Sequence, residues 1–289
     1  MKILPSLPDQ EFNCCVTSPP YWGLRDYGNN DQLGLESTPN EYVENMVAVF
    51  REVRRVLRDD GTVWLNLGDS YASNAATTKD PIKLPGAFES HRGSDTPTIN
   101  TNQQGRNTYR GSGIKGKDLC GIPWRVAFAL QADGWYLRQD IIWHKPNPMP
   151  ESVRDRCTKS HEYIFLLSKS PKYYYDYEAT KEPSNACVDT GKRNKRSVWS
   201  VTTKPFRGAH FATFPPDLIK PCILAGCPEG GMVLDPFMGS GTTLMVSEEN
   251  GRNSVGIELN DEYRKIADER LNGIASLFSN QSTNALHEG

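Results

Sequence analysis

The chain has 289 residues, of which 37% are hydrophobic and 24% are charged, and its formal net charge is −2. This composition excludes a disordered polyelectrolyte and a uniformly basic protein that coats nucleic acid, so any nucleic-acid site must be a local patch. No signal-peptide pattern and no long apolar run is present, so we expect a cytoplasmic protein without membrane contact. The seven cysteines include no C-x-x-C pair and the five histidines are widely spread, which predicts reduced thiols and no metal site.

The N-terminal part predicts strands that alternate with a helix. Residues 14–16 are apolar and stop at the sequence TSPPYW, residues 17–22, which predicts a buried strand followed by a loop. A helix is expected over 41–57, followed by a turn at 59–61 and a strand over 62–67. A strand, a helix and another strand in this order favour a parallel sheet.

Residues 70–117 break this alternation, because they are rich in Gly, Asn, Thr and Ser and show no periodicity. Between Thr96 and Lys117 the chain carries basic residues but no acidic one. A loop of this length is usually functional or disordered, so the pattern is compatible both with a solvated insertion and with a DNA-facing loop. In the second case Arg106 and Arg110 would contact DNA.

The middle of the chain predicts a helix over 123–132 and strands over 136–143 and 163–168. The following stretch, 176–209, is irregular. Between residues 190 and 207 it holds six basic residues and no acid, with aromatic residues among them. This mixture favours nucleic-acid contact, although a basic run is more often a solvated face. The predicted DNA-contacting residues here are Lys192, Arg193, Lys195 and Arg196.

The C-terminal part again predicts alternating helices and strands. In chain order these are a helix over 216–225, a strand over 232–235, a helix ending at 249, a strand over 254–259 and a helix over 261–271. Residues 273–289 are expected to form a polar tail.

A glycine loop follows the predicted strand 232–235. Its Gly-x-Gly sequence, residues 239–241, lets the backbone approach a ligand closely at a helix N-terminus. The loop lacks the lysine of a phosphate-binding loop, and Leu244 stands where a dinucleotide-binding motif has its third glycine, which disfavours a nicotinamide enzyme. Glu258 is placed to accept hydrogen bonds from ribose hydroxyls. A glycine loop with such an acid and without phosphate chemistry suits S-adenosylmethionine.

The TSPPYW loop forms a rigid ledge at the end of a strand, because its prolines fix the backbone and leave carbonyl oxygens free. The Ser18 hydroxyl and the Pro19 carbonyl can both accept hydrogen bonds from one amino group, and Tyr21 can stack on a planar ring. An enzyme that holds the exocyclic amine of a flipped-out base needs this arrangement. The alternative is a simple proline-bearing turn.

The ledge and the later sequence Asp235-Pro-Phe-x-Gly-x-Gly together resemble the DNA amino-methyltransferases. Because the ledge precedes the glycine loop, the order is similar to that of their beta class, a circular permutation. Segments 134–147 and 210–215 resemble the family as well. The resemblance covers most of residues 5–272 and is loose at the insertion and at the basic stretch.

The resemblance implies an α/β fold with a seven-stranded, mostly parallel sheet, helices on both faces and irregular DNA-facing insertions. Residues 1–175 would form the catalytic half of one domain, 176–209 a DNA-recognition segment and 210–272 the cofactor-binding half. Family members usually carry a further strand before the ledge, so the resemblance also points to a sheet edge that is absent here or a trimmed start of the chain.

The resemblance also implies roles for individual residues. The catalytic ledge would consist of Ser18, Pro19, Pro20 and Tyr21, with Trp22 or Trp143 lining the base pocket. The residues expected to shape the S-adenosylmethionine site are Asp235, Phe237, Gly239, Gly241, Thr242, Glu258, His210, Phe211 and Thr213.

The implied activity is methyl transfer to an exocyclic amine of a base in double-stranded DNA. A serine at the head of the ledge usually accompanies cytosine N4, whereas an aspartate accompanies adenine N6, so we expect cytosine N4 with adenine N6 as the alternative. An RNA or protein glutamine methyltransferase and a non-catalytic DNA-binding module are the more distant alternatives. A cognate restriction endonuclease and a second copy of the chain are possible partners.

Overall fold

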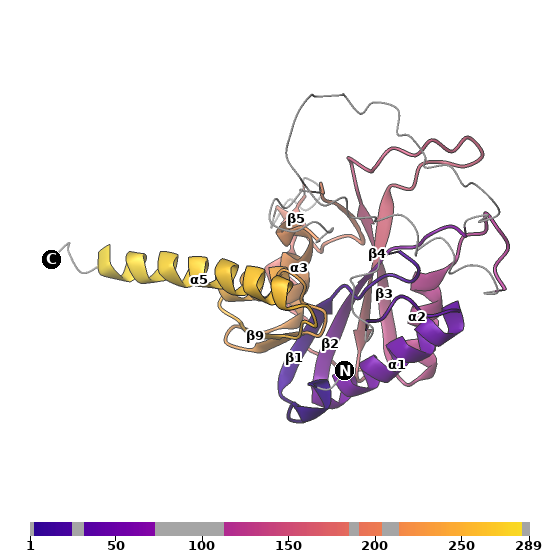
Figure 1. The fold of residues 1–289 in the computed structure, drawn as a ribbon. Helices are drawn as coiled ribbons and strands as arrows, with labels where there is room; N and C mark the ends of the chain where they lie inside the picture. The colour runs from indigo at the N-terminus through magenta and orange to yellow at the C-terminus, as the bar shows by residue number, and fades with distance from the viewer. Residues whose placement is uncertain (1–2, 25–31, 73–112, 185–190, 204–213, 285–289) are drawn as a thin grey trace, which may run out of the picture.

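The computed structural model describes residues 3–24, 32–72, 113–184, 191–203 and 214–284, with side chains as far as residue 273. Its centre is a seven-stranded sheet in the order β7-β3-β4-β2-β1-β8-β9 (Figure 1). The strands are β1 (Phe12–Thr17), β2 (Leu57–Leu67), β3 (Tyr136–His144), β4 (His161–Ser168), β7 (Val198–Ser200), β8 (Met232–Asp235) and β9 (Asn253–Gly256). β4 runs antiparallel to both of its neighbours, and all other pairs in this sheet are parallel. The predicted seven-stranded, mostly parallel sheet is confirmed.

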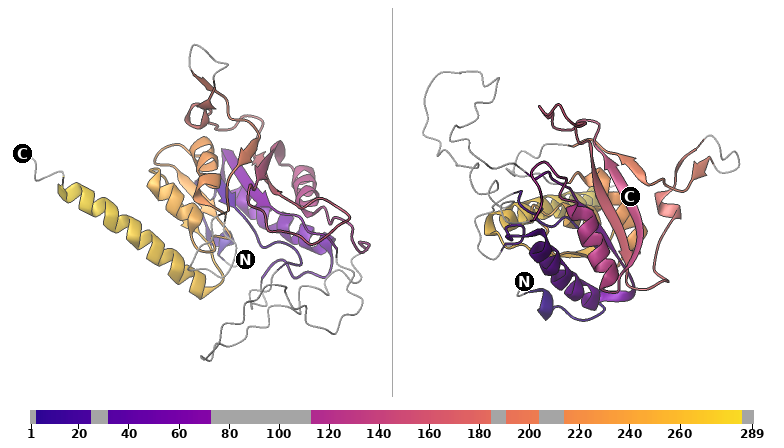
Figure 2. Two further views of the ribbon diagram at one scale, coloured as in Figure 1. Left: turned by 90° about the horizontal axis from the view of Figure 1, so that it is seen from above. Right: turned by 90° about the vertical axis from the view of Figure 1, so that its right-hand side faces the viewer.

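Helices cover both faces of this sheet. They are α1 (Pro39–Val56), α2 (Ile122–Ala132), α3 (Pro216–Gly226), α4 (Thr242–Glu249) and α5 (Asp261–Asn284), with short 3-10 helices η1 (Leu4–Ser6) and η2 (Glu178–Thr180). Helices α1 and α2 lie side by side on one face, as Figure 2 shows, whereas α3 packs on the other. A separate hairpin pairs β5 (Glu182–Pro183) with β6 (Lys192–Arg193).

Alternation along the central strands separates two apolar clusters. In β1, Cys15 is buried under α1 and α2, whereas Cys14 and Val16 are buried against α3. In β2, Val63 and Trp64 divide in the same way. Because successive side chains of a strand point to opposite faces, two adjacent apolar residues serve two different cores. The sheet is therefore buried on both sides, as parallel sheets require.

Helix α1 begins where the sequence places a start signal. The Thr38 hydroxyl accepts a hydrogen bond from the Glu41 amide at 3.2 Å, and Pro39 occupies the first turn. The turn expected at 59–61 is wrong, because β2 begins directly at Leu57. Leu57 pairs with Phe12 of β1 and Thr62 pairs with Cys14, so residues 58–61 form a bulge between two paired positions. The turn-forming residues are thus accommodated as an irregularity inside the strand.

The C-terminal end differs from the prediction in two ways. Strand β9 ends at Gly256, because Ile257 donates its amide to Asp235 and accepts from Met238 in the glycine loop. Helix α5 continues to Asn284 in place of the polar tail expected from residue 273, and it extends away from the sheet (Figures 1 and 2). One glycine inside a helix costs only about 1 kcal/mol, so Gly273 does not end it.

The two ends of the long insertion are joined at its base. Tyr71 forms an antiparallel bridge with Leu119, and the Ala72 amide donates to the Asp118 carbonyl at 2.8 Å. The Arg156 guanidinium lies 3.7 Å from the centroid of the Tyr71 ring. The chain therefore leaves and returns at one place beside the end of β2. Arg106 and Arg110 lie outside the described residues.

Candidate active site

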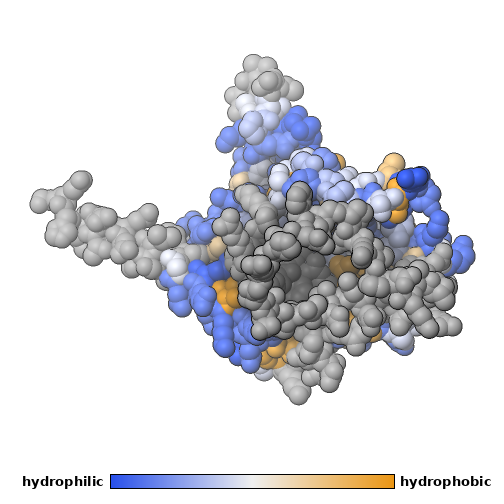
Figure 3. All heavy atoms as spheres, turned by 45° about the horizontal axis from the view of Figure 1, so that its top comes forward, coloured by the Kyte–Doolittle hydropathy of each residue, from blue (hydrophilic) through white to orange (hydrophobic). Residues whose placement is uncertain are grey.

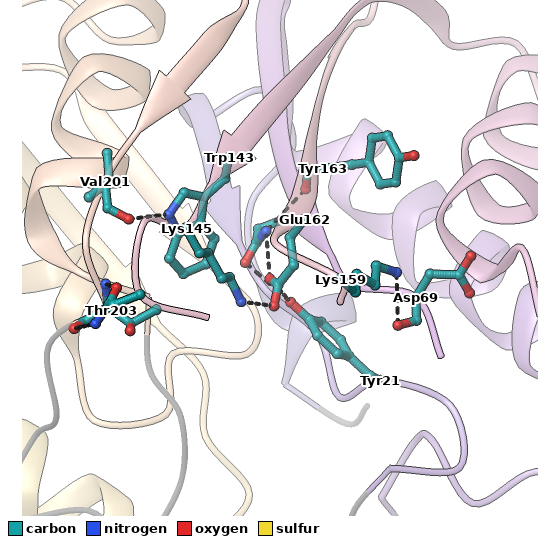
Figure 4. Close-up of polar contacts among 11 residues, drawn as sticks. Tyr21, Asp69, Trp143, Lys145, Lys159, Glu162, Tyr163, Val201 and Thr203 are labelled. Carbon is teal, nitrogen blue, oxygen red and sulfur yellow. Dashed lines mark hydrogen bonds and ion pairs between the residues drawn. The ribbon is translucent and has the colours of Figure 1, made fainter. Parts of the chain in front are cut away.

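The carboxyl ends of β1, β2, β3 and β8 and the start of β4 meet at one edge of the sheet. The ledge follows β1, Gly68 and Asp69 follow β2, Lys145 follows β3, and Glu162 lies near the start of β4 (Figure 4). The glycine loop follows β8, which is the neighbour of β1. The parallel arrangement thus brings the two predicted motifs together from sequence positions more than 200 residues apart.

Two aromatic side chains hold the ledge in place through hydrogen bonds to backbone carbonyl groups. The Tyr42 hydroxyl of α1 donates to the Pro20 carbonyl at 2.8 Å, and the Trp22 indole donates to the Glu36 carbonyl at 2.9 Å. Trp22 is only 1% exposed and belongs to the apolar core, so it does not line a base pocket. Trp143 is also buried, and its indole donates to the Val201 carbonyl at 2.8 Å.

Tyr21 is anchored by its hydroxyl group. It donates to Glu162 at 2.7 Å, while the Asn66 amide contacts the same carboxylate oxygen at 3.3 Å (Figure 4). The other Glu162 oxygen forms an ion pair with Lys145, whose ammonium lies over the Trp143 ring. Burial and the neighbouring Glu162 raise the pKa of the Tyr21 phenol well above its ordinary value. The phenol therefore stays protonated and acts as a fixed donor.

Gly68 makes room for this arrangement. A methyl group at this position would lie 2.6 Å from Cε2 of Tyr21 and 3.2 Å from the Glu162 carboxyl carbon. Any side chain here would push the tyrosine ring off the ledge. The glycine is therefore required by close approach of the neighbouring side chains.

Asp69 connects the site to α2. Its carboxylate accepts hydrogen bonds from the Gly121 and Ile122 amides, both at 3.1 Å, at the start of that helix. Lys159 donates to the Asp69 carbonyl at 2.9 Å. Burial lowers the pKa of the Lys159 ammonium. The contacts of Asp69 fix the turn after β2 in place.

Asp235 joins the glycine loop to the ledge strand. The carboxylate is buried and accepts from the Thr17 hydroxyl at 2.7 Å, the Thr243 hydroxyl at 2.6 Å and the Phe237 amide at 3.1 Å. Burial raises the pKa of this carboxyl to about 6, against the opposing effect of these hydrogen bonds. Thr17 immediately precedes Ser18, so Asp235 sets the position of one motif relative to the other.

The glycine loop itself is shaped by Glu258 and Gly241. The Glu258 carboxylate accepts from the Gly239 amide at 2.9 Å and from the Asn260 amide at 2.8 Å, which places the acid against the loop. Gly241 has φ of +77°, and a methyl group there would lie 2.8 Å from Cβ of Ala267 in α5. Gly239, with φ of +53°, has no atom within 4 Å of such a methyl group. The first glycine therefore faces open space and the second faces a helix.

Helix α5 closes the other side of the loop. Arg270 donates to the Ser240 carbonyl at 2.6 Å and to the Thr242 hydroxyl at 3.1 Å. Thr242 is buried and Phe237 packs against the core beneath the loop. His210, Phe211 and Thr213, predicted for the same site, lie outside the described residues.

Some of the residues predicted to contact DNA are already engaged in contacts within the protein. Arg193 and Arg196 both pair with Glu182 of β5, at 2.9 and 2.8 Å. Lys195 lies 5.0 Å from the Trp199 ring centroid. The described surface of this hairpin is largely hydrophilic, as Figure 3 shows. The sequence shows a run of basic residues, but it does not show that Glu182 of the neighbouring strand neutralises two of them.

Sequence reasoning did not identify Glu162, Lys145, Asn66 or Arg270. Glu162 and Asn66 stand among apolar residues of β4 and β2, and a charged or amide residue in an otherwise apolar strand end is the signal that was available. Arg270 carries no local signal, because its role depends on where α5 packs.

Comparison with known proteins identifies the family. A family model described as DNA methylase, of the N6/N4 type, matches residues 12–269. The chain belongs to this DNA methylase family. The Type II methyltransferase M.SmaI of Serratia marcescens is 55% identical over 272 residues, 93% of this chain and 87% of the relative. M.Cfr9I of Citrobacter freundii, also a Type II methyltransferase, is 53% identical over 94% of this chain and 85% of the relative.

Solved structures of DNA methylases share the fold. PvuII DNA methyltransferase, described as cytosine-N4-specific, superposes with a TM-score of 0.65 at 19% identity, covering 93% of this chain and 82% of its own. A putative DNA modification methylase of Thermus thermophilus, complexed with S-adenosyl-L-methionine, gives 0.62 at 22% identity, covering 93% and 88%. The predicted methyltransferase architecture is thus confirmed.

Within the described residues, His, Cys, Asp and Glu side chains form no group able to hold a metal ion. None of the described helices combines the length and apolarity needed to cross a membrane.

Proposed function

We propose that this DNA methylase transfers a methyl group from S-adenosylmethionine to the exocyclic N4 amine of cytosine in double-stranded DNA. The observation that carries the proposal is Ser18 at the head of the Pro-Pro-Tyr ledge, on the strand that pairs with the glycine-loop strand. A hydroxyl holds a neutral amine without placing a full negative charge in the pocket. The name of the PvuII structure, cytosine-N4-specific, supports the same base.

The residues around the glycine loop fit S-adenosylmethionine. Gly239 leaves open space above the loop, and the loop carries no phosphate-binding lysine. Glu258 is oriented by two backbone amides and would accept the ribose hydroxyls, while Gly241 keeps the loop close to α5. When bound, the cofactor supplies an activated methyl group on a sulfonium. The chain's own task is therefore to position the amine and exclude water.

The ledge supplies that positioning. Ser18 and the Pro19 carbonyl would accept the two amine hydrogens, which turns the nitrogen lone pair toward the cofactor side of the edge. Pro20 keeps the backbone rigid, and its carbonyl is already bound by Tyr42. Tyr21 would stack on the flipped base, an interaction worth roughly 1–3 kcal/mol per base.

The product of the reaction tests this proposal. Unmethylated mixed-sequence duplex DNA is incubated with the protein and S-adenosylmethionine, digested to nucleosides and analysed by mass spectrometry. We expect N4-methylcytosine and no N6-methyladenine, and no product from a folded Ser18→Ala variant. N6-methyladenine as the sole product would overturn the base assignment, and an absence of any methylated base would favour an RNA or protein substrate.

The biological setting follows from the relatives' names. Both relatives above are named Type II methyltransferases. We extend the proposal to a role in restriction-modification, in which the methylated site resists a cognate endonuclease. The basic hairpin and the insertion would supply the DNA contacts that the ledge does not.

A further inference from the structure

An apolar side chain stands out into solvent in the connection between β3 and β4, residues 145–160. Met149 is 84% exposed, the highest value among the large hydrophobic side chains of the described residues, and Val153 of the same connection is 41% exposed. Pro148 and Pro150 flank Met149, so the backbone on both sides is restricted. A single exposed methionine is common on protein surfaces. The position and the support of Met149 distinguish it from an incidental surface residue.

The β3–β4 connection begins and ends at the candidate active site. The Lys145 amide, directly after β3, donates to the Ser160 carbonyl at 2.7 Å, which closes the base of the connection. Lys145 pairs with Glu162, and Glu162 accepts a hydrogen bond from Tyr21 of the ledge at 2.7 Å. From this base the connection extends past the end of the sheet (Figure 1). Four residues span at most about 14 Å, so Met149 lies within that distance of Lys145.

Contacts with two other segments hold the connection in place. The Asn147 side chain donates to the Thr203 carbonyl at 3.1 Å and accepts from the Thr203 amide at 3.0 Å, just after β7. Arg156 pairs with Glu151 and lies over the Tyr71 ring at the base of the insertion. The exposed methionine is therefore carried by a fixed support, so little entropy remains to be lost when it binds a partner.

The charges of the connection suit a polyanion. It holds four basic and two acidic residues. Both acids are paired within the protein, Glu151 with Arg156, and Asp155 with Lys117 at 2.7 Å. Arg154 is exposed and can reach a phosphate group. An apolar tip beside an exposed arginine matches the two parts of a nucleic acid, the stacked bases and the charged backbone.

We propose that Met149 enters the base stack of the DNA when the target base is flipped out and fills the place that the base vacates. The inference rests on the proposed function of the ledge, because a paired base reaches Ser18 and Tyr21 only after it leaves the duplex. Lost stacking opposes flipping, so a side chain that fills the gap shifts the equilibrium toward the flipped state. Apolar side chains, methionine among them, insert between base steps in proteins that kink DNA. Methionine is also unbranched and polarizable, which suits an irregular gap.

Duplexes that differ in how firmly the target base is held test this role. The methylated position is first mapped in plasmid DNA, and duplexes then carry the target base either paired or opposite an abasic site. We expect Met149→Ala to lower the single-turnover rate of methyl transfer roughly 10- to 100-fold on the paired duplex and less than about threefold on the abasic duplex, where less opposes flipping. Met149→Leu should keep most of the activity. Ile3→Ala, which removes another exposed apolar side chain, is the control and should leave both rates unchanged.

A fluorescence readout does not depend on methyl transfer. 2-Aminopurine replaces the target base in the same duplex, and its fluorescence rises when it leaves the stack. At saturating protein, wild type and Met149→Leu should raise the fluorescence, and Met149→Ala should raise it clearly less. An equal rise in wild type and Met149→Ala, or a loss of rate that the abasic duplex does not restore, would overturn the inference.

The same experiments separate this inference from the proposed function. A wild-type protein that methylates adenine overturns the base assignment alone, because 2-aminopurine then replaces that adenine and still reports on Met149. Normal N4-methylcytosine formation by Met149→Ala at the wild-type rate overturns the inference and leaves the proposed function in place. A wild-type protein that methylates no DNA overturns both.

Discussion

At the scale of single residues, the two glycines of the loop differ in what surrounds them. Both have positive φ, but only Gly241 faces a neighbouring side chain, that of Ala267. The left-handed conformation costs a residue with Cβ roughly 1–2 kcal/mol, and overlap with a helix adds to that. The same substitution therefore has two different costs at positions two residues apart: strain alone at Gly239, and strain with displacement of α5 at Gly241.

We predict that Gly241→Ala lowers the melting temperature more than Gly239→Ala does. Gly239→Ala should cost roughly 1–2 kcal/mol, a shift of about 2–8 °C for a chain of this size, and Gly241→Ala clearly more. Calorimetry of both variants measures the difference, and titration with S-adenosylmethionine shows whether the loop still binds. Equal decreases of the melting temperature in the two variants would mean that α5 moves to accommodate the extra methyl group.

Asp235 gives a second residue-scale prediction, on pH. Its folded pKa of about 6 lies above the ordinary 3.8, so the folded state binds the proton more tightly than the unfolded state. This stabilising contribution is complete below pH 3.8 and is lost as the pH rises from about 4 to about 6, a change of roughly 3 kcal/mol. The difference in unfolding free energy between wild type and Asp235→Asn should therefore fall across this window. Urea unfolding at several pH values measures this difference. A difference in unfolding free energy that does not change with pH would contradict the prediction.

At the scale of elements, the hairpin β5–β6 is internally neutralised. Glu182 holds Arg193 and Arg196, which reduces the positive charge offered to a phosphate backbone. A basic run read from sequence alone thus overstates the charge that DNA would meet. The hairpin's contribution depends on whether DNA displaces the glutamate.

We predict that Glu182→Gln strengthens DNA binding and steepens its salt dependence. Each arginine released to a phosphate adds about −0.9 to the slope of log K against log salt. Glu178→Gln, which breaks the neighbouring pair with Lys181, is the matched control. Binding measured by fluorescence anisotropy at several salt concentrations reports both quantities. If the slope is the same in wild type and Glu182→Gln, the hairpin does not contact phosphates.

The insertion is a second element that can be tested as a unit. Its ends are held together by the bridge between Tyr71 and Leu119 and by hydrogen bonds of Ala72. Replacement of residues 73–112 by a short Gly-Ser linker should leave the melting temperature within a few degrees, because the closure is already made. DNA affinity should drop, since the segment carries Arg106 and Arg110. Unchanged affinity would identify it as a solvated insertion.

At the scale of the whole molecule, the cofactor loop and the ledge belong to one continuous sheet. The β1–β8 pair joins the two halves at Cys14 and Cys15, and Asp235 adds the Thr17 contact above it. A ligand bound to the C-terminal half therefore stabilises the N-terminal half as well. The unfolding transition should remain single and cooperative with and without ligand.

We predict that S-adenosylmethionine at about 100 times its Kd adds about 2.7 kcal/mol to the stability and raises the melting temperature by roughly 5–10 °C. Glu258→Ala should reduce this shift, because an ionised acceptor for the ribose is worth roughly 1.5–3 kcal/mol. Glu262→Ala, in the exposed first turn of α5, is the control. A full shift in folded Glu258→Ala would remove Glu258 from the cofactor site.

The sequence by itself determined the strand and helix order, the ledge, the glycine loop and the acid that follows it, because these are local patterns that need no partner. The start of β2 at Leu57 and the neutralised arginines were decided elsewhere, by the pairing of Leu57 with Phe12 of β1 and by Glu182. Tertiary structure alone placed Glu162 and Lys145 behind Tyr21, 141 residues away in the chain for the glutamate. The periodicity of apolar residues predicts which side chains become buried. Which residues they then contact is decided only when the strands pair.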